Sequence, residues 1–342
     1  VTGSADGTGV FVSTTTTGTV QVNDNVVTGA SLGISVNGDR PPEYSPATIK
    51  DNIVSDGNNA LNLTDGNYMI SNNQLSGSGY KIQETGSVKT VYSGNTIDWT
   101  GLKGIRVSGT VFRDQTWSTS NSLGQPYVVT DDLTVNARLT IEAGTIVKMA
   151  VDRRTSSGGY QYTKRIFVNG ILDAQGTTAN PIYITSLRDD SPETGGDTNN
   201  DSTLTIPAKG DWGYIKFNGT GSSDSVMRHV VIRYGGLRDD NSSSSETWHN
   251  YMVWANGSSP LISNTRFEHF YETGMRMDNP SLDVVFSNNS FSFGSNGLYL
   301  NGPDTQLIDA TVLNNDISVV YTGINVKWGA TGDVLIDGNT VT

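Results

Sequence analysis

The sequence predicts an all-β protein, a right-handed parallel β-helix with three short parallel sheets and coils of about 21–27 residues. Two observations predict this fold. The chain of 342 residues is rich in Gly, Ser, Thr and Asn, which disfavours helices and favours short strands joined by turns. Short alternating apolar runs such as "RLTIEAGTIVKM" and "GYIKFNG" also recur along the chain, whereas no helical apolar period of useful length is found.

A repeated segment defines the coils. Each copy consists of a strand, an Asn, a short strand, a Gly-containing turn and another strand, as in "YMISNNQLSGSGYKIQETG". In the N-terminal copies, separated by 27, 21 and 22 residues, the aligned positions are Asn25, Asn52, Asn73 and Asn95. In the C-terminal copies, separated by 24, 26 and 24 residues, they are Thr265, Asn289, Asn315 and Asn339.

The residue types of these copies separate a β-helix from a leucine-rich repeat of similar period. A leucine-rich repeat needs Leu at fixed places and a helical side, whereas these copies carry Val, Ile, Thr and Phe. A buried turn leaves backbone groups without ladder partners, and an amide side chain can satisfy them. We therefore expect the aligned asparagines to form a structural ladder along the solenoid.

The coils are expected to form a single solenoid over residues 1–342. Residues 1–110 and 261–342 show regular coils, and residues 111–260 show coils with long insertions at 151–164, 187–209 and 237–250. Insertions in solenoids usually emerge on one face, which is often the binding face. Both ends fall inside the repeat, so we expect a segment of a longer protein, with further domains or subunits at the open ends.

The stretch from residue 139 to 236 is similar to segments of a known class of proteins. The run "LTIEAGTIVKM…IFVNGILDAQGTTANPIYITSLRDD…GGDTNND…GDWGYIKF…MRHVVIRYGG" resembles the right-handed β-helix modules of secreted and cell-surface bacterial proteins, which share the pectate-lyase-like superfold. The lyase signature motifs themselves are missing from the sequence. The resemblance implies an extracellular or cell-surface location, and implies an activity only weakly, because this superfold carries lyases, hydrolases, adhesins and stalks.

The stretch "GGDTNNDST" within this run predicts a calcium site. Its alternating oxygen side chains have the spacing of the first half of an EF-type loop, but position six is Ser202 instead of Gly, and position twelve is Ala208 instead of Glu. Calcium tolerates irregular oxygen cages, and neighbouring acidic residues extend this one. The expected ligands of a structural calcium ion are Asp189, Asp190, Asp197, Asn199 and Asp201. A weaker candidate comprises Asp239, Asp240 and Asn241.

Aromatic residues provide a second type of candidate site. Sugar rings stack on flat aromatic faces, and "ETWHNYMVWANG" concentrates such residues at the end of the third insertion. The candidate carbohydrate-binding residues are Trp117, Trp248, Tyr251, Trp254 and Tyr271.

Composition excludes several other classes of function. With no Cys, the chain has no disulfide or thiol chemistry, and a formal net charge of −12 argues against nucleic acid as a partner. No stretch approaches 18 consecutive apolar residues, so we expect no membrane insertion. Catalytic residues are not predicted, since adjacent aspartates such as Asp131 and Asp132 point to opposite faces of a strand.

These observations favour a calcium-stabilised extracellular module for binding or adhesion, with a cell-surface polysaccharide as its ligand. One alternative is a polysaccharide lyase or glycoside hydrolase on the same fold. That alternative requires acidic and basic side chains from three successive coils to converge in one groove. The other alternative is a structural stalk or a phage-type spike segment with its aromatic residues buried.

Overall fold

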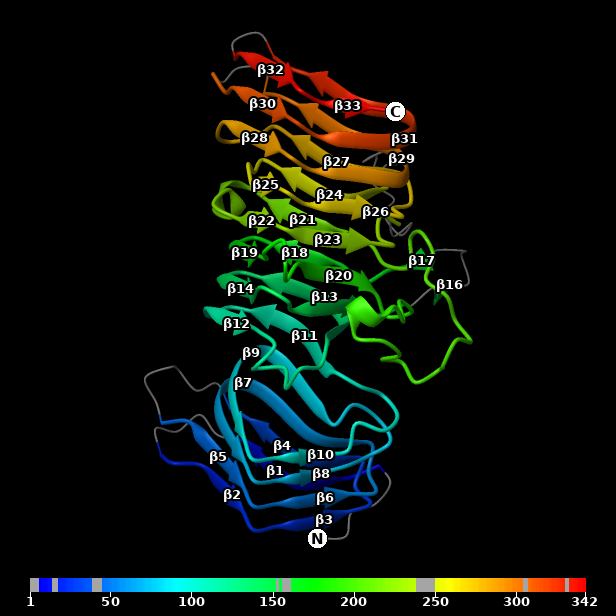
Figure 1. Ribbon diagram of the computed structural model, residues 1–342. Coiled ribbons are helices and arrows are strands. Elements are labelled where there is room, and N and C mark those ends of the chain that lie inside the picture. The colour runs from blue at the N-terminus through cyan, green and yellow to red at the C-terminus, as the bar shows by residue number, and fades with distance from the viewer. Residues whose placement is uncertain are drawn as a thin grey trace.

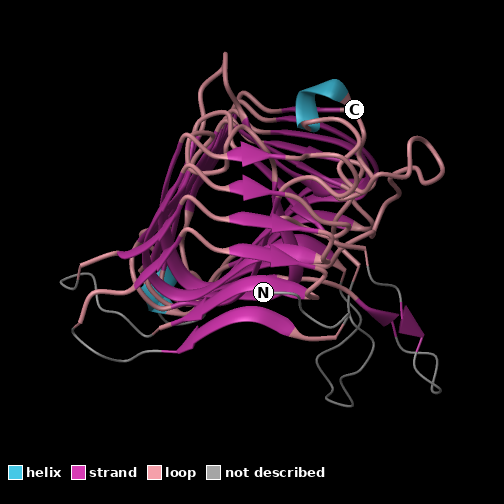
Figure 2. Cartoon of the chain, turned by 90° about the horizontal axis from the view of Figure 1, so that it is seen from below, coloured by secondary structure: helices cyan, strands magenta, loops and turns pink. Residues whose placement is uncertain are grey.

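The computed structural model describes residues 6–13, 18–38, 45–151, 154–155, 161–237, 250–303, 307–329 and 332–342. Parallel strands stack into a β-solenoid of about 12 turns, which rises from the N-terminus to the C-terminus (Figure 1). Viewed along its axis, the solenoid has strands on several sides of a common interior (Figure 2). The all-β prediction and the parallel solenoid are confirmed.

Most coils contribute strands to three sides of the stack. The N-terminal coils contain β1 (Thr8–Ser13), β2 (Gln21–Asn23), β3 (Val26–Thr28), β4 (Leu32–Asn37), β5 (Ala47–Lys50), β6 (Ile53–Ser55), β7 (Asn59–Ser71), β8 (Gln74–Leu75), β9 (Ile82–Ser93) and β10 (Thr96–Ile97). Strands β3, β6, β8 and β10 form a four-stranded parallel sheet. The other N-terminal strands belong to a 19-stranded sheet that bends around the solenoid.

The middle of the chain continues the stack and carries the insertions. Its elements are β11 (Ile105–Val111), β12 (Gln115–Trp117), β13 (Tyr127–Val135), β14 (Arg138–Glu142), β15 (Ile146–Met149), β16 (Arg154–Thr155), β17 (Gln161–Tyr162), β18 (Ile166–Val168), β19 (Ile171–Gln175), β20 (Ile182–Ser186), the 3₁₀ turn η1 (Pro192–Thr194), β21 (Ile215–Asn218), the 3₁₀ turn η2 (Thr220–Ser222), β22 (Val226–Arg228), β23 (Val230–Arg233) and β24 (Tyr251–Asn256). Within the described part of the chain, neither 3₁₀ turn is long and apolar enough to cross a membrane.

The C-terminal coils are regular again. They contain β25 (Leu261–Ser263), β26 (Arg266–Glu268), β27 (Thr273–Asp278), β28 (Val284–Ser287), β29 (Ser290–Asn301), β30 (Ala310–Leu313), β31 (Asp316–Lys327), β32 (Val334–Asp337) and β33 (Thr340–Val341). An eight-stranded parallel sheet runs through β12, β14, β19, β22, β25, β28, β30 and β32. Strand β24, for example, pairs with β21 on one side and β27 on the other, so each coil hydrogen-bonds to the coils before and after it.

The predicted asparagines meet in two ladders. Asn52 donates its backbone and side-chain N–H groups to Asn73 Oδ1, at 3.0 and 2.8 Å, and Asn73 makes the same pair of bonds to Asn95. In the C-terminal coils, Asn289 bonds to the next rung, Asn315, in the same way. The residue before each ladder asparagine lies in the left-handed region of backbone conformation, as Asp51 does before Asn52, with φ 56°. This conformation, which Asn, Asp and Gly adopt at low cost, turns the chain between two strands.

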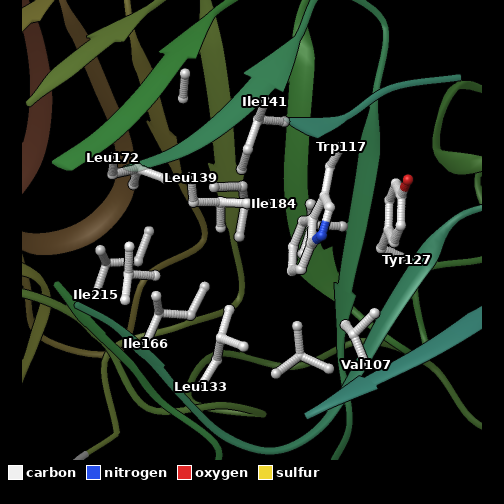
Figure 3. Close-up of a cluster of buried hydrophobic side chains, with 14 of the residues drawn as sticks. Val107, Trp117, Tyr127, Leu133, Leu139, Ile141, Ile166, Leu172, Ile184 and Ile215 are labelled. Carbon is white, nitrogen blue, oxygen red and sulfur yellow. The ribbon is translucent and has the colours of Figure 1, made fainter. Parts of the chain in front are cut away.

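The interior is a continuous apolar core. Figure 3 shows part of it, where Val107, Leu133, Leu139 and Ile184 point into the interior from β11, β13, β14 and β20. Trp117 stacks on Tyr127 here, with ring centroids 4.7 Å apart.

Candidate functional site

The loop of residues 187–211, between β20 and β21, lies against the outer wall of the solenoid. In Figure 1 it is the bright green segment on the right of the stack. It rests on Lys148, a fully buried residue of β15. The Lys148 ammonium group donates to the carbonyl oxygens of Asp189 and Gly196, at 2.8 and 2.7 Å. Burial lowers the pKa of Lys148 to about 8, against the opposing effect of nearby carboxylates.

The stretch predicted to bind calcium, residues 195–203, curls around Asp197. Its two carboxylate oxygens accept the backbone N–H groups of Asp201 and Ser202, at 3.2 and 3.0 Å. Asn200 and Ser202 have left-handed φ angles of 57° and 64°, which tighten the curl. The backbone N–H of Lys103 donates to the carbonyl of Thr198 at 3.0 Å and ties the curl to the solenoid. The chain is therefore held in a shape that turns its side-chain oxygens toward a common point.

Three carboxylates meet at this point. Oxygen atoms of Asp190, Asp197 and Asp201 all lie within 4.8 Å of one another, and the three residues are half-buried. Asn199 joins them, because its amide nitrogen donates to Asp201 Oδ2 at 2.7 Å. The Thr205 hydroxyl also donates to Asp201 Oδ2. Four of the five predicted ligands are thus neighbours.

The hydrogen bonding of this cluster is incomplete. The Oδ1 atoms of Asp190, Asn199 and Asp201 are buried, and none has a hydrogen-bond donor among the described residues. Such oxygens are costly to bury, and carboxylates also repel one another. Burial, together with the charges of Asp197 and Asp201, raises the pKa of Asp190 despite the nearby Lys148. A hard cation that prefers oxygen ligands, as calcium does, would remove both penalties, so the residues fit that ion.

Asp189, the fifth predicted ligand, lies outside the cluster. Its oxygens accept hydrogen bonds from the hydroxyl groups of Thr185 and Ser191, at 2.6 and 2.7 Å, and face the Arg233 guanidinium at 3.7 Å. Asp189 therefore anchors the start of the loop and does not point at the cluster. The weaker candidate of residues 239–241 lies outside the described residues.

Arg233 connects the loop to the next coils, a contact that no pattern in the sequence indicated. Its guanidinium pairs with Glu193 of the loop at 3.2 Å and with Glu268 of β26 at 2.8 Å. The ring of Tyr183 lies below it, 5.4 Å from the guanidinium carbon. Glu193 and Glu268 lie 40 and 35 residues from Arg233 in the sequence. The one signal that could have predicted their contact is that each residue occupies an outward-facing position in its coil.

The predicted aromatic residues do not form one platform. Trp117 is 1% exposed in the core, so the prediction that it presents its ring to a glycan is wrong. Its period-2 position in β12 faces the interior, where a large apolar ring gains most from burial. Trp248 lies outside the described residues. Tyr251 is 7% exposed, with the Arg276 guanidinium 5.1 Å from its ring centre, so it also offers no open face.

The two remaining aromatic candidates lie on the surface in different settings. Trp254 is half-buried on β24, where its ring nitrogen donates to Asp278 at 2.9 Å and the Lys216 ammonium lies 4.0 Å from the ring centre. Tyr271 is 46% exposed and lies beside Gly210, at the end of the acidic loop. Among the four predicted rings that the structure describes, Tyr271 is therefore the most open to a ligand.

Comparisons with family models, curated proteins and solved structures found no match for this chain. The parallel β-solenoid therefore rests on the structure itself.

The raised pKa of Asp190 predicts that any binding of calcium to this cluster depends on pH. Without a cation, the folded chain holds this proton more tightly than the unfolded chain, so its stability falls as the pH rises through the range above 3.8. Calcium favours the ionised carboxylate, so the stabilisation by calcium should be greatest near neutral pH and decline as the pH falls into that range. Unfolding temperatures with calcium and with chelator, measured from about pH 4 to about pH 7, test this. A difference that stays constant over this range would contradict it.

Proposed function

We propose that this chain is a calcium-stabilised module of an extracellular β-helix protein, and that it binds polysaccharide at a cell surface. The observation that carries the calcium part is that three buried oxygens, of Asp190, Asn199 and Asp201, have no hydrogen-bond partner among the residues that the structure describes. The ion would have a structural role. Lys148 and Arg233 already join the acidic loop to several coils, and a cation would stiffen the loop on the wall of the solenoid.

The proposal that the chain binds polysaccharide is supported by the elongated shape of the solenoid. A rigid stack of coils exposes a long lateral surface on which the side chains of successive coils repeat at the strand spacing of about 4.8 Å. An extended glycan has a similar repeat along its chain, so it can contact several coils at once. The half-buried Trp254 and the exposed Tyr271 lie on this surface.

Polysaccharide cleavage is the second candidate, because acidic and basic groups from three successive coils meet at Arg233. Glu193 follows β20, Arg233 lies on β23 and Glu268 lies on β26. A general acid needs a raised pKa, whereas a backbone hydrogen bond and Arg233 lower the pKa of Glu193. Glu268 is engaged by the same guanidinium. These contacts favour an ion-paired clamp for the loop over acid–base catalysis.

Binding to immobilised polysaccharides, measured with calcium and with chelator, tests the proposed function. We expect retention on at least one polysaccharide in calcium and weaker retention in chelator, with the chain length of the polysaccharide unchanged after incubation. The appearance of shortened products would favour the cleavage candidate. Retention on none of a broad panel of neutral and acidic polysaccharides would overturn the binding proposal and favour a structural stalk.

A further inference from the structure

Three aromatic rings from successive coils form a stacked column beside the acidic loop. Tyr234, His269 and Phe293 follow the register-matched residues of β23, β26 and β29. The rings of Tyr234 and His269 are 5.2 Å apart and nearly parallel, at 17°, and those of His269 and Phe293 are 4.4 Å apart at 4°. His269 is thus enclosed between two rings, and Phe293 ends the column on the C-terminal side.

The backbone of this column is in an unusual conformation. Tyr234, His269 and Phe293 have φ angles of 65°, 53° and 59°, in the left-handed region. Of the sixteen non-glycine residues that the structure describes there, ten are Asp or Asn, for which this conformation costs least. A bulky ring is a costly choice at such a corner, and strain of this kind clusters at ligand-binding sites. Stacking explains the inner ring His269, but among the described rings Phe293 has a partner on one face only.

The other face of Phe293 has no ring partner among the described residues, and its side chain is 60% exposed. Phe293 is an extra residue in its strand, since Ser292 pairs with Ser318 and Gly294 with Val319. The next coil therefore has no residue opposite Phe293, and the column stops at a gap. Here a hollow of about 460 Å³ opens, within the size range of small-ligand sites.

The lining of the hollow joins apolar surface to polar groups. Phe293, Val319 and Val320 offer apolar surface, and Ser318 and Lys209 offer a hydroxyl and an ammonium group. Gly294 faces the interior beneath the hollow, where a β-carbon would collide with the ring of the buried Phe270. The pKa of His269 is lowered, chiefly by burial, so this ring is neutral at pH 7 and Lys209 is the charged group of the lining.

We propose that this hollow binds one sugar ring of a glycan chain, which lies on the free face of Phe293 as the next member of the column. The C–H face of the sugar would contact the phenyl ring, and its hydroxyl or carboxylate groups would accept hydrogen bonds from Ser318 and Lys209. This inference rests on the proposed function and assigns its contact site to residues outside the predicted aromatic set.

Phe293→Asn is the decisive variant, because it removes the ring and places at this corner a residue type that adopts the left-handed conformation at low cost. The probes are a neutral glucan hexasaccharide and a hexamer of uronic acid, titrated calorimetrically into the calcium-loaded protein. We expect Phe293→Asn to weaken binding about tenfold, and Phe293→Trp to retain it. Phe11→Ala removes an equally exposed ring on β1 and serves as the matched control, with binding unchanged.

Two results separate the possible failures. If the wild-type protein binds a probe and Phe293→Asn binds it equally well, the hollow is not the contact site, and the proposed function stands. If the wild-type protein binds neither hexasaccharide nor any immobilised polysaccharide, both proposals fail. Lys209→Gln distinguishes an acidic sugar ring from a neutral one. It should weaken binding of the uronic acid probe and leave binding of the neutral probe unchanged. Binding of aromatic peptides in place of both probes would overturn the assignment to a sugar.

Discussion

Calcium is expected to raise the unfolding temperature of this protein by about 4 °C, with a smaller effect of magnesium. A ligand that binds only the folded state stabilises it by about 2.7 kcal/mol at ~100 times its Kd, and that free energy corresponds to a few degrees in a chain of this size. The Oδ1 atoms of Asp190, Asn199 and Asp201 are buried and have no donor within the described part of the chain, and calcium would supply a partner for all three.

The measurement is thermal unfolding in calcium, in magnesium and in chelator. The double variant Asp197→Asn/Asp201→Asn keeps the size of both side chains while it removes two charges, and it should abolish the calcium effect. Asp224→Asn, at an exposed position away from the loop, is the control and should keep the effect. Equal unfolding temperatures of the wild-type protein in calcium and in chelator would contradict the proposal that this loop binds calcium.

Loss of one inner rung of the asparagine ladder is expected to destabilise the fold by about 3 kcal/mol. Asn73 is fully buried, and its amide group donates to the carbonyls of Ile49 and Ser71 and to Asn95 Oδ1, at 2.9, 3.0 and 2.9 Å. Its Oδ1 also accepts two bonds from Asn52, at 3.0 and 2.8 Å. Asn73→Ala would leave buried polar groups on three neighbouring coils without partners.

Denaturant unfolding of Asn73→Ala and wild type gives the difference in free energy of unfolding. The matched control is Asn218→Ala, because Asn218 is exposed and bonds to Asn169 at 3.2 Å on the outside of the solenoid. We expect the control to change stability by no more than about 0.5 kcal/mol. A similarly small change for Asn73→Ala would show that the ladder contributes little beyond the strand pairing.

The sequence alone determined the coil repeat, since the features that define it are local. Each corner needs a left-handed residue followed by an amide, as in Asp51-Asn52 and Asn288-Asn289, and these pairs recur at the coil spacing. Coils contact mainly their sequence neighbours, so the period predicts which residues stack. The acidic loop was also recognisable, because its five expected ligands lie within thirteen residues of one another in the sequence, and four of them are neighbours in the structure.

Only the tertiary structure decided which side chains face the interior and which of them meet outside. Trp117 and Phe293 are both large apolar residues in strands, yet one is in the core and the other is 60% exposed. The difference depends on a bulge in β29, in which Phe293 is the extra residue and faces outward, and no local pattern marks that bulge. Arg233 and Glu268 meet because β23 and β26 are paired strands of successive coils, although 35 residues separate them in the sequence. Coil length varies with its insertions, so contacts between coils outside the asparagine ladder follow from three-dimensional register and not from spacing in the sequence.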